Sequence, residues 1–122
     1  MNKLRNCLLN VALKYCKELG YDFKEDKESS SWFSPDHQEK DIYIYQKPNT
    51  KENRKTNGYI CIRSRFGNPR IGIYGPEKEW FVAIELNKDS GEFAESQVFS
   101  PKGVEMFKIV HDDVVNEIKR NQ

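Results

Sequence analysis

The chain has 122 residues, a length that fits one globular domain and leaves no room for two. Hydrophobic residues make up 37% and charged residues 32%, and aromatic side chains recur throughout, which excludes a disordered chain. No apolar run reaches the roughly 18 residues of a membrane span, and the N-terminus lacks the apolar core of a signal peptide. We therefore expect a cytoplasmic protein with no membrane partner, in which residues 1–122 form a single α+β domain.

The net charge of +1 is unevenly distributed along the chain. Residues 47–70 carry seven basic residues against one acidic residue, a net charge of +6. Residues 1–46 have a net charge of −1, and residues 76–122 have a net charge of −4. The middle of the chain is therefore a local basic segment on a protein that is almost neutral overall.

The three cysteines are Cys7, Cys16 and Cys61, and none belongs to a C-x-x-C pair. Cys7 and Cys16 are nine residues apart, which places them on opposite sides of a helix and keeps them from sharing a metal ion. We expect buried or half-buried thiols in a reducing compartment, and no metal or other cofactor.

A helix is predicted over residues 2–19. Apolar residues repeat there at helical spacing and form one stripe: Leu4, Leu8, Val11, Tyr15 and Leu19. Asn2 suits the N-cap, and Gly20 stands where a left-handed residue ends a helix.

A mostly antiparallel sheet of about five to six strands is predicted between residues 31 and 99. Alternating or apolar runs indicate strands at 41–46, 59–66, 71–74, 80–86 and 92–99, with a further short strand at 31–33. Turns are expected at Asn57-Gly58, at Gly67-Asn68-Pro69 and over 87–91, and loops over 24–31 and 47–58.

Ser100-Pro101 predicts the start of a C-terminal helix, with serine as the N-cap and proline in the first turn. Its expected apolar stripe is Val104, Phe107, His111, Val114, Val115 and Ile118. Because His111 falls in the middle of this stripe, we expect it to be a packed, hydrogen-bonded core histidine.

Three short motifs resemble parts of catalytic sites, and each lacks its necessary partners. Gly72-Ile73-Tyr74 matches the GIY tripeptide of a nuclease family, but no YIG-type strand follows it. His111-Asp112 has only one other histidine in the chain to complete a metal site. Glu85 and Lys88 are one residue too far apart for the Glu-x-Lys arrangement of restriction nucleases. We therefore predict no catalytic residues, no metal ligands and no enzymatic activity.

The two predicted helices, at opposite ends of the chain, would most simply cover the same face of the sheet. Period-two alternation then assigns to that face Ile42, Ile44, Ile60, Ile62, Ile71, Ile73, Trp80, Val82, Ile84 and Leu86. The opposite, open face would present Tyr43, Tyr45, Tyr59, Arg63, Arg65, Tyr74 and Phe81. Aromatic and arginine side chains of this kind are typical of binding hot spots.

The composition of the open face favours a small non-catalytic binding module that engages a protein partner, as inhibitors and immunity-type proteins do. The alternative is a nucleic-acid-binding module, in which tyrosines stack on bases and the phosphates contact Lys47, Lys51, Arg54, Lys55 and Arg70. The near-neutral net charge argues against that alternative. In a third interpretation the face is covered by the 24–40 loop or by a second copy in a homodimer, and arginine stacks on tyrosine only for packing.

Overall fold

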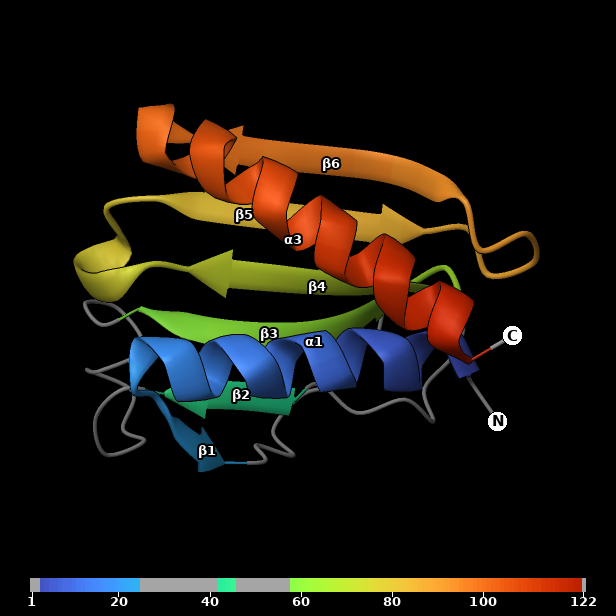
Figure 1. Cartoon of the computed structure of the whole chain (residues 1–122), viewed down its shortest axis with the longest axis horizontal. Coiled ribbons are helices and arrows are strands. Elements are labelled where there is room, and N and C mark those ends of the chain that lie inside the picture. Colours follow the sequence, from blue (N-terminus) through green and yellow to red (C-terminus); the bar gives the residue numbers. More distant parts are fainter. Residues whose placement is uncertain (1–2, 25–41, 46–57, 122) are drawn as a thin grey trace.

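The computed structural model describes residues 3–24, 42–45 and 58–121. In chain order, the elements are α1 (Lys3–Leu19), β1 (Asp22–Lys24), β2 (Ile42–Tyr45), β3 (Tyr59–Arg65), β4 (Asn68–Tyr74), η1 (Pro76–Lys78), β5 (Phe81–Leu86), β6 (Phe93–Phe99) and α3 (Ser100–Arg120) (Figure 1). The predicted strand at 31–33 lies outside the described residues, as do the loop at 25–31, the loop at 47–57 and the Asn2 cap. In the described part of the chain, no helix is long and apolar enough to cross a membrane.

Strands β3 to β6 form a four-stranded antiparallel sheet, in which each strand pairs with the next one along the chain. The short strands β1 and β2 continue the same order beyond β3. The predicted α+β class, with an N-terminal helix, an antiparallel sheet and a C-terminal helix, is confirmed. Strand β1 was not predicted, because three residues are too few to show a period-two pattern.

Helix α1 forms as its apolar stripe predicts. Its buried residues are Cys7, Leu8, Val11, Ala12, Tyr15 and Cys16. Gly20 ends the helix with a φ of +73°, the left-handed conformation expected of it. The backbone N–H of Tyr21 then donates to the Cys16 carbonyl at 2.8 Å. All three cysteines are buried and form no disulfide, as expected, and burial raises the pKa of the Cys7 and Cys16 thiols.

The turn between β3 and β4 lies earlier than predicted. The sequence predicts a turn at Gly67-Asn68-Pro69, but the register pairs Arg65 with Asn68, so the turn is Phe66-Gly67. These two residues have φ values of 53° and 84°, which suit the tight hairpin that follows the twist of its strands. Pro69 is tolerated in β4 because the pairing with β5 begins only at Arg70.

Helix α3 buries only part of the predicted stripe: Val114 is buried, and Phe107 and Ile118 pack against the core. Its buried residues are Gly103, Val110, Val114 and Glu117, whereas Val104 is 49% exposed. A Cβ atom at Gly103 would lie 2.8 Å from the Phe81 carbonyl oxygen, so glycine lets the helix approach the backbone of β5 closely. This approach rotates Val104 outward, an effect that apolar spacing cannot reveal.

The predictions for the start of α3 and for His111 had different outcomes. Phe99 rather than Ser100 is the N-cap, but the Ser100 hydroxyl, at the first helical residue, accepts a hydrogen bond from the Gly103 N–H at 3.3 Å. His111, by contrast, is not a core residue, because its side chain is 39% exposed. Its ring stacks on Phe93 at a centroid distance of 4.2 Å and contacts Phe107 at 5.6 Å. The prediction of a buried histidine was therefore wrong.

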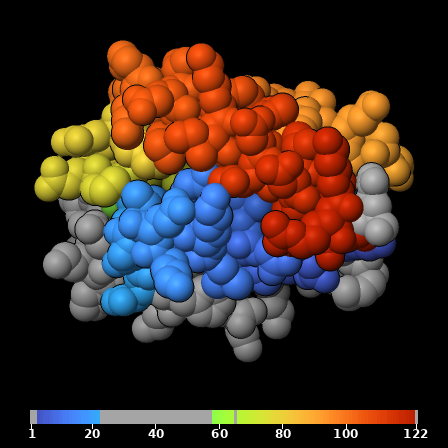
Figure 2. All heavy atoms as spheres, viewed as in Figure 1, coloured from blue at the N-terminus to red at the C-terminus, as the bar shows by residue number. Residues whose placement is uncertain are grey.

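A single core cluster contains buried side chains of both helices and the inward side chains of the sheet. Seven of these side chains are at most 1% exposed: Ile60, Ile62, Ile71, Ile73, Val82, Ile84 and Leu86. The same cluster contains Val11 and Tyr15 of α1 and Val110 and Val114 of α3. In the space-filling view, the atoms of α1 and α3 pack side by side over this face of the molecule (Figure 2).

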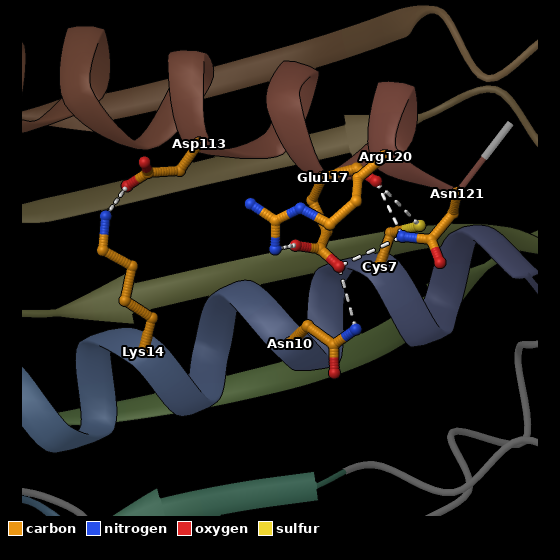
Figure 3. A network of polar contacts seen from close by, with 7 residues as sticks. All are labelled: Cys7, Asn10, Lys14, Asp113, Glu117, Arg120 and Asn121. Atoms are coloured by element: carbon orange, nitrogen blue, oxygen red, sulfur yellow. Dashed lines mark hydrogen bonds and ion pairs between the residues drawn. The ribbon is translucent and has the colours of Figure 1, made fainter.

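A polar network joins α1 to α3 at the edge of this core (Figure 3). The Glu117 carboxylate accepts hydrogen bonds from Asn10 at 2.9 Å, from Asn121 at 3.1 Å and from Arg120 at 3.1 Å. Asp113 accepts from the Lys14 ammonium at 2.9 Å and from the Tyr15 hydroxyl. The buried charge of Glu117 is therefore compensated, and the first and last helices are held in a fixed register.

Candidate binding surface

The sheet surface opposite the core, called the outer face below, is built from the alternate residues of β3 to β6. The strand register arranges its side chains in three rows that cross the strands: an aromatic row, a row of small residues and a charged row. The aromatic row is Tyr59, Tyr74, Phe81 and Phe99. The row of small residues is Cys61, Gly72 and Ala83, and it ends on β6 at the larger Gln97. The charged row is Arg63, Arg70, Glu85 and Glu95.

The aromatic row is a stack of rings. The Tyr59 and Tyr74 ring centroids are 4.5 Å apart and the Tyr74 and Phe81 centroids 4.3 Å apart. These distances are close to the spacing between neighbouring strands of about 4.8 Å, so the rings stand side by side. The Tyr59 and Tyr74 rings are stacked at an interplanar angle of 20°, and the Phe81 ring is tilted by 33° to that of Tyr74. The outer face therefore presents mainly ring edges, and Phe99, at the end of the row, is 60% exposed.

The Lys78 ammonium lies beside this stack, 5.2 Å from the Tyr59 ring centroid and 5.8 Å from that of Tyr74. Partial burial lowers the pKa of Lys78. Burial also raises the pKa of the Tyr59 phenol, and neighbouring Cys61 and Tyr74 add to that shift. Tyr59 therefore remains neutral and can donate or accept a hydrogen bond at physiological pH.

The small residues of the middle row allow neighbouring side chains of the outer face to pack closely. A Cβ atom at Gly72 would lie 3.1 Å from the Cys61 sulfur and 3.6 Å from the Phe81 ring. Cys61 and Ala83 are both buried. Glycine thus fits the tight packing at the position that begins the GIY tripeptide, where a Cβ atom would displace the Cys61 side chain by a few tenths of an ångström.

The charged row is bipolar, with two arginines on β3 and β4 and two glutamates on β5 and β6. Arg70 lies 3.8 Å from the Glu85 carboxylate and donates to the Gln97 side-chain oxygen at 3.0 Å. Glu85 is only 7% exposed and also accepts a hydrogen bond from Asn68 at 3.2 Å. The geometry thus combines a neutral aromatic strip with a fixed pair of opposite charges.

The former nuclease candidate Glu85 has a structural role in this row. Lys88 does not join it there, because Lys88 lies in the exposed loop and its backbone N–H donates to the Asn68 side chain at 2.9 Å. Among the residues the structure describes, no three histidine, cysteine or acidic side chains gather as metal ligands would.

The structure places five of the predicted site residues together on the outer face: Tyr59, Arg63, Arg70, Tyr74 and Phe81. For Tyr43, Tyr45 and Arg65 it describes the backbone alone, which pairs Tyr43 with Cys61, Tyr45 with Tyr59 and Arg65 with Asn68. The predicted phosphate contacts Lys47, Lys51, Arg54 and Lys55 lie outside the described residues.

Sequence reasoning missed Asn68, Lys78, Glu85 and Gln97 as members of this surface. The signal for Glu85 and Gln97 was present in the alternation of β5 and β6. It was overlooked because polar residues at those positions resemble an ordinary solvent-facing surface.

Comparisons of the chain with protein-family models, with curated proteins and with solved structures found no match.

Proposed function

We propose that this protein is a non-catalytic binding module whose outer face engages a protein partner in a stoichiometric complex, as an inhibitor or immunity-type protein would. In this proposal the six strands form one sheet, both helices cover its inner face, and the outer face is left for the partner. The common core of α1, α3 and the inward isoleucines supports that arrangement. The observation that carries the proposal is the stacked aromatic row beside the bipolar charged row.

Ring stacking favours a protein partner over a nucleic acid. Base binding by aromatic residues needs a free ring face, on which the base stacks. Tyr74 has both faces occupied, by Tyr59 on one side and by Phe81 on the other. A row of upright rings instead offers a rigid apolar strip with hydroxyl groups, which is the composition enriched at the centre of protein interfaces.

The charged row supports the same conclusion. Arg70 is engaged by Glu85 and Gln97, and the two glutamates lie on the same surface. A phosphate backbone would be attracted to one half of the row and repelled by the other. A protein surface can match both halves with opposite charges, which gives orientation as well as affinity.

The test uses affinity capture from the native host with the wild-type chain and three variants. Tyr74→Leu removes the central ring of the aromatic row, and Arg63→Glu reverses an exposed charge of the charged row. Lys108→Glu is the matched control, because Lys108 is exposed on α3. The captured protein is then purified and titrated against each variant.

We expect one partner to be retained at a fixed stoichiometry by the wild type and the control. Each outer-face variant should weaken its affinity by at least about tenfold, because a hot-spot truncation costs roughly 2 kcal/mol or more. A partner that binds all three variants equally would show that the interface lies elsewhere. Capture of a nucleic acid, with an affinity that falls with salt by a log–log slope of about −0.7 per phosphate contact on single strands, would replace the proposal with the nucleic-acid alternative.

A further inference from the structure

Strand β6 is the edge of the sheet farthest from β1. In the described part of the chain it pairs with β5 on one side and with no strand on the other. Soluble proteins protect edge strands from pairing with another chain by bulges, by covering elements and, within the strand, by charged side chains, of which lysine is the most effective, or by proline. The sequence of β6, Phe-Ala-Glu-Ser-Gln-Val-Phe, contains neither residue. A single bulge at Ala94 interrupts its pairing with β5, and Glu95–Phe99 is regular.

Exposed apolar side chains concentrate at this edge. Val98 is 44% exposed and Phe99 60% exposed, and both lie in β6. Val104 follows in the first turns of α3 and is 49% exposed. Figure 1 shows these first turns beside the end of β6, so the three residues belong to one end of the molecule. Pairing of β6 with another strand would cover apolar surface that the single chain leaves in water.

We propose that a second copy of this chain pairs with β6, antiparallel and about a two-fold axis at Ser96. In this register Glu95 lies opposite Gln97 of the other copy, and by symmetry the same pair forms twice. Each Glu95 carboxylate therefore faces a Gln97 amide across the axis, within the regular part of the strand. Phe93 and Phe99 do not meet across the axis, because the bulge at Ala94 leaves Phe93 paired with Leu86 on the inner face, whereas Phe99 pairs with Phe81 on the outer face.

This self-complementarity is what selects a second copy over an unrelated peptide. Within one chain the Gln97 amide nitrogen lies 3.4 Å from the Glu95 carboxylate, and its oxygen accepts from Arg70. The Gln97 side-chain nitrogen carries two hydrogens, so one can bond within the strand and the other across the axis. The dimer joins the two sheets edge to edge, and it needs neither an outside partner nor the aromatic row.

The experiment is sedimentation equilibrium of the full chain over a wide range of protein concentration. The expected result is a reversible shift from 14.4 kDa to twice that mass. Ser96→Lys places two ammonium groups against each other at the axis, and Gln97→Glu places a carboxylate opposite each Glu95. Both positions are exposed, so the fold should be retained, and circular dichroism checks this. Each variant should raise the dissociation constant of the dimer by at least about tenfold, because like charges directly opposite one another destabilise paired strands.

Two further variants make the test specific to this register. Ser90→Lys adds the same charge in the exposed loop before β6 and should leave the dissociation constant unchanged. The double variant Glu95→Gln with Gln97→Glu exchanges the two groups and should restore a dissociation constant close to that of the wild type. A mass of 14.4 kDa for the wild type at every concentration would overturn the proposal. So would a dimer that is unaffected by Ser96→Lys, or a double variant as weak as Gln97→Glu alone.

Discussion

The inner and outer faces of strands β3 to β5 are made from alternate residues of the same segments, yet they are held together differently. The inner face is aliphatic, and its isoleucine, valine and leucine side chains are at most 1% exposed. The outer face consists of stacked rings, small residues and an ion pair. Aliphatic burial is non-directional and scales with area, whereas stacking and ion pairing depend on geometry. The inner face thus supplies most of the stability, and the outer face supplies the groups that can recognise a partner.

The sharpest test of this difference truncates a side chain of β4 on the inner face. Ile73 is fully buried on the inner face, so Ile73→Ala should lower the free energy of unfolding by about 2–5 kcal/mol through lost burial and a residual cavity. Urea denaturation followed by tryptophan fluorescence measures this loss. The exposed control Lys108→Ala should change stability by less than about 0.5 kcal/mol. An equal loss in both variants would contradict the assignment of the core.

Alkaline pH should destabilise the fold through tyrosines on both sides of the sheet. Burial raises the pKa of Tyr15, Tyr21 and Tyr59 above the ordinary value, and the hydrogen bond to Asp113 adds to the shift at Tyr15. The folded state keeps protons that the unfolded state loses. The stabilisation is therefore complete below about pH 10 and is lost as the pH rises further, by as much as about 1.4 kcal/mol per pH unit for each such group.

Absorbance at the tyrosinate band measures this coupling directly. We expect these three of the six tyrosines to ionise only together with unfolding, as detected by circular dichroism at the same pH. Ionisation of all six tyrosines with an unchanged fold would show that the side chains are accessible to water.

The variant Gly103→Ala tests how closely helix α3 packs against the backbone of β5 on the inner side of the sheet. In an ordinary helix, Gly103→Ala would stabilise by up to about 1 kcal/mol through helix propensity. Here the added Cβ would lie 2.8 Å from a backbone oxygen of β5. We therefore expect a net destabilisation of about 1–3 kcal/mol from overpacking, measured as a lower urea midpoint. Asn116→Ala, at an exposed position of the same helix, is the control. A stabilised Gly103→Ala variant would contradict the close approach.

The smallest effect on stability is expected on the outer face. Tyr74→Leu removes two ring contacts, each worth about 0.5–1.5 kcal/mol beyond area burial, and should lower the free energy of unfolding by roughly 1–2 kcal/mol. Thermal and urea unfolding measure this change against Ile73→Ala. A loss of unfolding free energy as large as that of Ile73→Ala would show that the outer face contributes as much to stability as the inner face.

Much of the architecture was predictable because the hydrophobic periodicity of each segment matches the side that the tertiary structure buries. The apolar stripe of α1, the left-handed Gly20 and the alternation of β3 and β5 each reflect an element with one buried side. The same alternation placed Tyr59, Tyr74 and Phe81 on the outer face.

The sequence by itself determined which elements form and which residues of each strand share a face, because the periods of helix and strand are local properties. Only the tertiary structure decided which side of α3 is buried, because that depends on the fit of Gly103 against the backbone of β5. It also decided that Glu117 is buried with partners from α1, and that the rings of the aromatic row face each other. These are distances between segments far apart in the chain, and they follow from strand register and helix placement, which no single segment encodes.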